Sequence, residues 1–255
     1  MNATPYRTHT VAEVGPELIG ASVRLSGWAH TIRRQRHIAF VLLREASGAI
    51  QVVLPPSAVE GLTPESAIQV EGVVAARAPH RNPAVASPPV ELRAESVFIL
   101  NRASPLPFSA HETPSEEERL RHRPLSMRWN PGPLHQRAAM VEALRASTRS
   151  EGFIEVETPV LVRRTPGGAA PFEVPVGNGM GYALAQSPQI WKQLLVCGGV
   201  ERYCQLAHCF RNEGARPERQ PEFSQFEIEV AFTTAAEVQG IMERAVRAGA
   251  SALGV

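Results

Sequence analysis

The part of this chain that most constrains its fold is a pair of apolar segments joined by a polar loop with several arginines. Residues 204–210 and 223–232 have the composition and alternation of β-strands, so we expect two antiparallel strands joined by a long loop. The loop carries Arg211, Arg216 and Arg219. Arginine suits phosphate oxygens, because its guanidinium group stays charged and offers several donors in one plane. On the pattern alone, a basic hairpin at an exposed sheet edge is the alternative.

Length and composition are typical of a globular protein. The 255 residues suffice for one large or two ordinary domains, and 44% apolar with 20% charged residues excludes a disordered chain. The formal net charge is +1, so any surface that binds nucleic acid must be a local basic patch. No apolar run approaches the ~20 residues of a membrane span, and the polar start is no signal peptide. These features predict a cytoplasmic protein without membrane contact.

The three cysteines are Cys197, Cys204 and Cys209, which do not suggest a disulfide framework and fit a reducing compartment. His208 beside Cys209 raises the alternative of a metal site, but the spacing C-x6-C-x3-H-C is not a familiar ligand pattern. We prefer the interpretation that these cysteines are buried in strands, because a free cysteine is usually a small buried hydrophobe. We therefore expect no metal site built from these residues.

Residues 21–100 consist of five apolar or alternating segments separated by turns. Five strands in about 80 residues predict a small closed barrel, and the oligonucleotide-binding (OB) barrel is the commonest solution of that size. A basic cluster precedes the second segment, which carries Phe40. Unpaired bases stack on aromatic rings while arginines hold phosphates. The alternative is that Phe40 belongs to the core beside a solvated loop. The cluster comprises Arg33, Arg34, Arg36 and His37.

Residues 101–133 are rich in proline and charge, which predicts a hinge between two parts. Ser115, followed three residues later by Glu118, has the pattern of a capping box and predicts a short helix. We expect a barrel domain over residues 1–104, a connector over 105–133 and a second domain over 134–255.

Apolar residues at helical spacing predict a helix over residues 134–150 at the start of the second domain. Alternation of apolar and polar residues predicts a strand over residues 152–162, and a second helix is expected over residues 235–252. Between them, a strand runs into Ser187 and a helix begins at Gln189. Gln189 and Lys192 share one helix face, where an amide and an ammonium could hold a carboxylate. An exposed helix with an ordinary lysine is the alternative.

Residues 210–229 read FRNEGARPERQPEFSQFEIE and closely resemble the second signature motif of class II aminoacyl-tRNA synthetases. RQPEF and SQFEIE resemble the bacterial aspartate enzymes in particular, whereas FRNEG is shared with the lysine enzymes, which remain an alternative. The resemblance implies an ATP site with Mg²⁺. In that site, Arg211 would bind the α-phosphate and be catalytic, and Arg219 would bind the γ-phosphate. Phe223 would stack on adenine, and Glu213 would meet the adenine amino group. Gln220 would also bind ATP.

Two further stretches resemble the same family. GWAHTIRRQRHIAFVLLRE with GAIQVV resembles the anticodon-binding barrel of the aspartate enzymes, which implies that Phe40 stacks on and Gln51 hydrogen-bonds to anticodon bases of tRNA. Arg33 and Arg77 would complete that basic surface, whereas Ala75 replaces an expected arginine. The helix and strand over residues 134–162 resemble the first motif, which implies a homodimer with Pro159 at its interface.

QSPQIWKQLL resembles the amino-acid motif of the aspartate enzymes, which implies that Ser187 and Gln189 surround the substrate and that Lys192 binds its side-chain carboxylate. Glu227 stands where those enzymes carry aspartate, so its carboxylate reaches about 1.5 Å further. Glu229, near the metal and ATP in the family, is retained.

Two departures bear on activity. In the loop that covers the amino acid, Gly167, Ala170 and Pro171 replace a glutamate, an arginine and an aspartate of the family. No stretch before Val255 resembles the family's third motif, which carries an ATP-clamping arginine. We therefore expect weak or no aspartate-dependent pyrophosphate exchange by this chain alone.

The resemblance predicts an α+β protein, with an N-terminal five-stranded OB barrel followed by a partial class II core built on an antiparallel sheet. Its expected function is ATP-dependent charging of tRNA with aspartate, with no role for DNA. One alternative is a non-catalytic paralogue that binds tRNA or a protein partner. Another is an adenylate-forming ligase that loads a different acceptor, against which the retained barrel argues.

Overall fold

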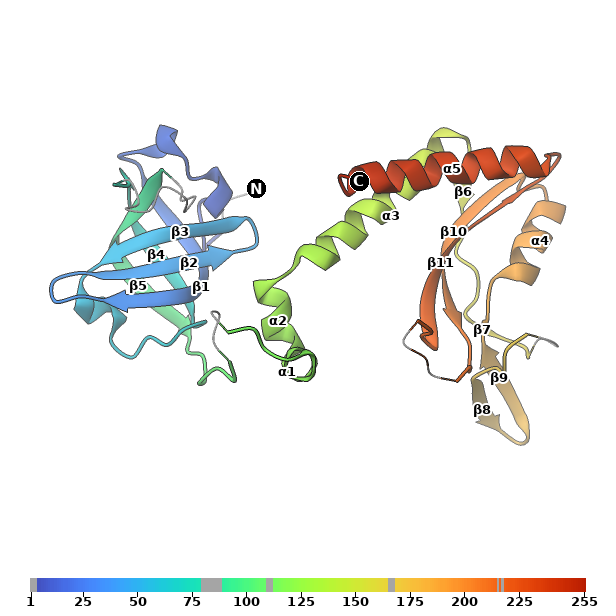
Figure 1. Ribbon diagram of the computed structural model, residues 1–255, viewed down its shortest axis with the longest axis horizontal. Coiled ribbons are helices and arrows are strands. Elements are labelled where there is room, and N and C mark those ends of the chain that lie inside the picture. The colour runs from blue at the N-terminus through green and yellow to red at the C-terminus, as the bar shows by residue number, and fades with distance from the viewer. Residues whose placement is uncertain (1–3, 79–88, 109–111, 165–167, 215, 217) are drawn as a thin grey trace. The chain divides into compact units, whose positions relative to one another are not determined.

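The computed structural model describes residues 4–78, 89–108, 112–164, 168–214, 216 and 218–255. The chain divides into two compact units, Met1–Trp129 and Asn130–Val255 (Figure 1). None of the helices in these described ranges is long and apolar enough to cross a membrane.

The first unit is built on a closed barrel of five strands in the order β1-β2-β3-β5-β4. All neighbouring strands pair antiparallel except β3 and β5, which run parallel. Three short 3-10 helices accompany the barrel, and the predicted OB architecture is confirmed. The strands are β1 (Ser22–Arg34), β2 (Ala39–Glu45), β3 (Gly48–Leu54), β4 (Ala67–Ala76) and β5 (Val90–Asn101), and the 3-10 helices are η1 (Val11–Glu13), η2 (Pro16–Leu18) and η3 (Pro56–Val59).

Alternation along the strands sorts side chains between the barrel core and its outer surface. In β2, Ala39, Val41 and Leu43 are completely buried, so Phe40, between two of them, points to the other face. Burial of each large aliphatic side chain contributes about 1.5–3 kcal/mol of transfer free energy. A shift of β2 by one residue would expose these side chains, so their burial determines which face Phe40 occupies. The possibility that Phe40 is a core residue is therefore wrong.

Glycine permits the closest backbone approach within the barrel. Gly72 lies on β4 at an irregularity in its pairing with β5, where a Cβ atom would lie 2.1 Å from the carbonyl oxygen of Arg93. Any larger residue would push the two strands apart, so this position requires glycine.

Two short helices follow the barrel, α1 (Glu116–Arg121) and α2 (Arg123–Trp129). The predicted capping box is present. The backbone N–H of Glu118 donates to Ser115 Oγ at 3.2 Å, and the Glu118 carboxylate accepts from the Ser115 N–H at 2.9 Å. The short helix predicted inside the connector is confirmed.

The second unit contains the predicted hairpin, formed by β10 (Arg202–Phe210) and β11 (Glu222–Val230). One face of this sheet packs on helix α5 (Ala235–Ala252), where Phe153, Cys204 and Ile241 form a small core. Helix α3 (Gly132–Ser150) lies beside α5 (Figure 1), and Gly249 allows that approach. The helices predicted at residues 134–150 and 235–252 are confirmed.

The continuous strand predicted over residues 152–162 is wrong. Its start, β6 (Ile154–Glu155), pairs in parallel with β10, so that sheet is mixed and not purely antiparallel. Its end, β7 (Leu161–Val162), belongs to a second small sheet with β8 (Glu173–Gly177) and β9 (Met180–Leu184). Pro159 lies between the two pieces, where its missing N–H removes no ladder bond.

Of the cysteines, Cys204 and Cys209 are buried in β10 as predicted. The prediction is wrong for Cys197, which ends helix α4 (Gln189–Cys197) and is exposed. Burial raises the pKa of the Cys209 thiol to about 11, with a smaller contribution from the charge of Glu227.

Candidate functional site

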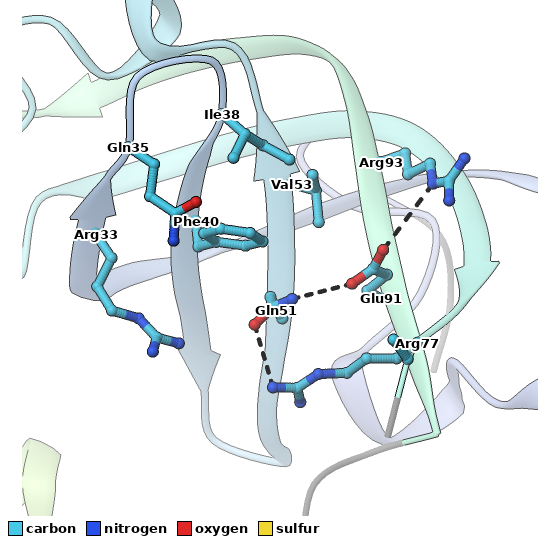
Figure 2. A pocket seen from close by; sticks show the side chains of 10 residues that line it. Arg33, Gln35, Ile38, Phe40, Gln51, Val53, Arg77, Glu91 and Arg93 are labelled. Carbon is cyan, nitrogen blue, oxygen red and sulfur yellow. Dashed lines mark hydrogen bonds and ion pairs between the residues drawn. The ribbon is translucent and has the colours of Figure 1, made fainter. Parts of the chain in front are cut away.

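The four residues predicted to bind tRNA line one open pocket of about 810 Å³ on the outer surface of the barrel (Figure 2). Phe40 comes from β2 and Gln51 from β3, while Arg33 and Arg77 lie at the ends of β1 and β4. An aromatic ring, an amide and two guanidinium groups therefore face the same space. The full lining comprises Arg33, Gln35, Ile38, Phe40, Gln51, Val53, Arg77, Ala78, Glu91 and Arg93.

The amide of Gln51 is held at both ends (Figure 2). Its Nε2 donates to Glu91 Oε2 at 2.9 Å, and its Oε1 accepts from Arg77 Nη2 at 3.1 Å. Arg93 Nε lies 4.0 Å from the other oxygen of Glu91. This network fixes the orientation of the amide before any ligand arrives. Sequence reasoning missed Glu91 and Arg93, because the parallel pairing of β3 with β5 is a long-range contact.

The remainder of the predicted basic cluster does not line the pocket. Arg34 donates to the carbonyl oxygen of Val59. Arg36 and His37 are exposed in the turn between β1 and β2. Of the four basic residues in that cluster, only Arg33 contributes to the pocket.

The five residues predicted to bind ATP line a second pocket of about 600 Å³, at the loop end of the β10–β11 hairpin. Its residues all belong to the segment between β10 and the start of β11, which explains why a local motif could find them. They are Arg211, Glu213, Arg219, Gln220 and Phe223, together with Glu218.

Arg211 is oriented before a ligand binds. Its guanidinium carbon lies 5.2 Å from the centre of the Phe223 ring, its Nε donates to the carbonyl oxygen of Gln186 at 3.5 Å, and its N–H donates to Pro221 O at 2.9 Å. A cation above an aromatic face is attracted by the ring quadrupole. The guanidinium is thus held beside the ring on which a base could stack.

Arg219 has a looser arrangement. Its Nη1 lies 3.4 Å from Glu213 Oε2, and about half of the Arg219 side chain is exposed. Exposed ion pairs of this kind contribute about 0–1 kcal/mol, so a phosphate could readily replace the carboxylate. Arg216 is exposed, accepts from the Arg219 N–H at 3.0 Å through its carbonyl oxygen, and does not line the pocket.

Of the residues predicted to bind the amino acid, Lys192 and Glu227 are in contact with each other at the hairpin. Lys192 projects from α4, and its Nζ lies 3.3 Å from carboxylate oxygens of both Glu227 and Glu229 on β11. Only 13% of the Lys192 side chain is exposed, so the alternative of an ordinary surface lysine is wrong. Ser187 is half-buried before α4, whereas Gln189, at the first turn, is exposed.

A strap over residues 168–170 lies against the start of the loop. The N–H of Asn212 donates to Ala170 O at 3.0 Å, and Gln186 Nε2 donates to Ala169 O at 2.8 Å. Gly168 has φ +77°, a conformation that favours glycine. The strap contains one of the predicted departures from the family, Ala170. Pro171 follows it, and Gly167 lies outside the described residues.

Within the described part of the chain, no three His, Cys, Asp or Glu residues gather in a way that could hold a metal. Mg²⁺ usually keeps several waters and binds through one or two carboxylates plus substrate phosphates. Glu229 on β11 is a carboxylate at the hairpin, and it lies 3.3 Å from Lys192 Nζ.

Pro159, predicted at a dimer interface, is exposed. Ile154 and Leu161, on either side of it along the chain, are 58% and 48% exposed. The dimer stays a prediction.

An OB barrel with a basic, aromatic pocket, followed by a hairpin whose loop arginines line a nucleotide-sized pocket, is the arrangement of a class II aminoacyl-tRNA synthetase. The family model described as tRNA synthetases class II (D, K and N) matches residues 115–254, and that of the OB-fold nucleic acid binding domain matches residues 23–100. The chain belongs to the class II tRNA synthetases of the D, K and N group.

Curated relatives narrow the resemblance to the aspartate enzymes. The chain is 43% identical to the aspartate–tRNA(Asp/Asn) ligase of Micrococcus luteus over 98% of its own length and 42% of the relative. It is 42% identical to the aspartate–tRNA ligase of Stenotrophomonas maltophilia over 95% of its length and 43% of the relative. The chain therefore spans less than half the length of these relatives.

Among solved structures, the fold resembles asparaginyl-tRNA synthetase from Pyrococcus horikoshii complexed with asparaginyl-adenylate. The TM-score is 0.84 at 27% identity, over 96% of this chain and 57% of that one. The similarity extends over both units.

Proposed function

We propose that the protein acts in the charging of tRNA with aspartate, with the barrel binding the anticodon loop and the second unit binding ATP and the amino acid. The observation that carries this proposal is the barrel pocket, where Phe40, Gln51, Arg33 and Arg77 face one open space. The aspartate enzymes among the relatives support the choice of amino acid.

The barrel pocket suits an unpaired base next to its phosphates. Phe40 offers a face for stacking, which is worth about 1–3 kcal/mol per base. The Gln51 amide, held by Glu91 and Arg77, can exchange one of its internal hydrogen bonds for the edge of a base. Arg33 lies at the rim of the same pocket and can meet a phosphate.

The hairpin pocket suits a nucleoside triphosphate. Phe223 would stack on adenine, Glu213 would accept from its amino group, and Gln220 lines the same pocket. Arg211 and Arg219 would neutralise phosphate charge, which assists attack at the α-phosphorus. Mg²⁺ bound to the triphosphate would further neutralise it. Arg211, already oriented by Phe223 and Gln186, is the residue that we place on the α-phosphate.

The amino acid would bind at Lys192, which lies outside the lining of the hairpin pocket, and would use Ser187 before α4 and Gln189 at its first turn. Lys192 would release one of its two carboxylate partners and meet the side-chain carboxylate of aspartate. Glu227, one methylene longer than the aspartate of the family, would leave less room for aspartate beside Lys192. Lysine and asparagine are the alternative substrates, the latter because the Pyrococcus horikoshii relative was solved with asparaginyl-adenylate.

A non-catalytic tRNA-binding role is the second candidate, favoured by Ala170 in the strap and by Pro171 after it, where the family carries charged residues. We further propose a homodimer through the exposed segment around Pro159, and a cytoplasmic location, where charged tRNA is used. The adenylate-forming alternative gains no support from the barrel pocket.

The experiment combines tRNA binding with aspartate-dependent pyrophosphate exchange on the purified chain. Binding with exchange supports the ligase, and binding without exchange supports the non-catalytic role. Failure to bind any tRNA contradicts both, because both depend on the barrel pocket.

A further inference from the structure

A polar cluster outside these sites lies in the turn that leads into β4. At its centre is Glu65, whose side chain is only 1% exposed and whose backbone has φ +64°. A positive φ in a residue other than glycine costs about 1–3 kcal/mol, and it persists only where the surroundings hold it. The contacts around Glu65 must therefore stabilise both its positive φ and its buried carboxylate.

Four side chains contact the carboxylate of Glu65, two from the barrel and two from the end of α2. In the barrel, His30 Nδ1 lies 2.8 Å and Arg44 Nη2 lies 3.2 Å from Oε1. In α2, Trp129 Nε1 donates to Oε1 at 2.9 Å, and Arg128 Nη1 lies 3.1 Å from Oε2. One buried carboxylate thus ties the end of α2 to the barrel.

Ring contacts reinforce this attachment. The Arg128 guanidinium lies 4.4 Å from the centre of the Trp28 ring on β1. The Trp129 ring meets His30 edge-on at 6.2 Å and Phe108 at 5.4 Å between ring centres. Phe108 is itself a buried residue of the connector. The end of α2 therefore packs against both the barrel and the connector's own beginning.

The same turn also holds the segment that directly follows β5. Thr63 Oγ1 donates to Ala103 O at 2.8 Å, and the N–H of Ala103 donates to Ser66 Oγ at 3.1 Å. The turn is anchored in the barrel, because the N–H of Glu65 donates to Ala29 O at 2.8 Å and the N–H of Ala29 donates to Ser66 O at 2.9 Å. The segment after β5 and the end of α2 therefore both meet at one turn.

We propose that the turn over residues 63–66 is a two-point clamp that makes α2 part of the barrel body, with Glu65 as the residue that positions α2. The joint between the two units then lies in the residues that directly follow Trp129. Helix α2 has seven residues, too few for an isolated helix to be stable. Its order therefore depends on the clamp, and the RNA-binding barrel and α2 move together.

The charges explain why one carboxylate can carry this role. Without Glu65, the cationic groups of Arg44 and Arg128 would share a partly buried space without the counter-ion that each now contacts. Leaving a buried charge unpaired is strongly destabilising. The least costly response is to release Arg128, which moves α2 out of its place.

Hydrogen exchange on the full chain, followed by mass spectrometry, tests the clamp. In Glu65→Gln, we expect the amides of residues 123–129 to exchange at least about tenfold faster, while β1–β3 keep wild-type rates. Glu71→Gln is the matched control. It also removes a carboxylate of the barrel, one that pairs with Arg24 at 2.5 Å, and Glu71 is not part of the turn over residues 63–66. An α2 that exchanges at the wild-type rate in Glu65→Gln would overturn the proposal.

Trp129→Phe provides a second test that leaves the buried charges intact. It removes the indole N–H that donates to Glu65 and replaces the ring that meets His30 and Phe108 by a smaller one, so we expect α2 to exchange faster without a change in the melting temperature of the barrel. Unchanged α2 exchange in this variant, or equal acceleration throughout the barrel, would count against a clamp. Neither measurement uses RNA or ATP, so its outcome is independent of the proposed function.

Discussion

The ammonium of Lys192 lies 3.3 Å from a carboxylate oxygen of Glu227, and only 6% of the Glu227 side chain is exposed. Among the described residues, that oxygen has no hydrogen-bond donor, so the contact is an ion pair without good hydrogen-bond geometry. Helix α4 and strand β11 are therefore joined by buried charge at the place where the amino acid would bind. Under the proposed function, this pair would link the stability of the second unit to the choice of amino acid.

Lys192→Met should lower the free energy of unfolding by about 3 kcal/mol, because it leaves Glu227 buried without its cation. Denaturant titration measures the change. The double variant Lys192→Met/Glu227→Gln should regain most of the loss, since it removes the unpaired charge. A double variant no more stable than Lys192→Met would show that the pair is not what holds this region.

Arg211→Ala should weaken the binding of ATP with Mg²⁺ by about tenfold or more, because hydrogen bonds to charged groups contribute about 1.5–3 kcal/mol. Arg216→Ala is the control, since Arg216 lies in the same loop but outside the pocket. Calorimetric titration of both variants separates a specific phosphate contact from general loop charge. Equal affinities in the two variants would remove Arg211 from the nucleotide site.

Cys197 should be the only thiol that reacts quickly with iodoacetamide at pH 8. It is exposed, whereas burial raises the pKa values of the Cys204 and Cys209 thiols, which keeps both as unreactive thiols. Peptide mapping after timed alkylation identifies the modified residue. Rapid labelling of Cys209 in the folded protein would show that the face of the hairpin that carries Phe223 and Glu227 opens to solvent.

Acid should destabilise the attachment of α2 through Glu65. Burial alone would raise the pKa of Glu65, but hydrogen bonds from His30, Trp129 and Arg128, with the charge of Arg44, outweigh burial and hold it below its usual value. The ionised carboxylate thus stabilises the folded state above the unfolded pKa of about 4.3. That contribution is lost as pH falls through the lower pKa of the folded state.

Melting temperatures measured between pH 6 and pH 3 check this dependence. The wild-type protein should lose stability over that range more steeply than Glu65→Gln, which has no proton to take up at that position. Parallel curves for the two proteins would contradict the role assigned to the Glu65 charge.

Much of the fold was predictable, because its signals are local. The hairpin follows from strand alternation around a polar loop, and the residues predicted to bind ATP all lie between the end of β10 and the start of β11. The barrel follows from five apolar segments at short spacing, and the helix after Ser115 from a capping box. The sequence left open whether Phe40 lies in the core or on the surface of the barrel. The burial of its neighbours Ala39 and Val41 places Phe40 on the outer face.

The features that could not be predicted from the sequence depend on contacts between residues far apart in the chain. The segment over residues 152–162 alternates like one strand, yet Ile154 pairs with β10 and Leu161 with β9, so two sheets divide it. Glu91 enters the barrel pocket through the parallel pairing of β3 and β5, which no local pattern indicates. Glu65 acquires its partners from three separate segments, and its positive φ has no sequence signal.

The proposed function depends most on binding of tRNA by the barrel pocket through Phe40. The most direct measurement is a fluorescence-anisotropy titration of an aspartate-type anticodon stem-loop with the wild-type protein and with Phe40→Ala, at a fixed salt concentration. We predict binding by the wild-type protein and affinity about tenfold or more weaker for Phe40→Ala, because a stacked base loses its partner. No binding by the wild-type protein, or the same affinity in both proteins, would contradict the account.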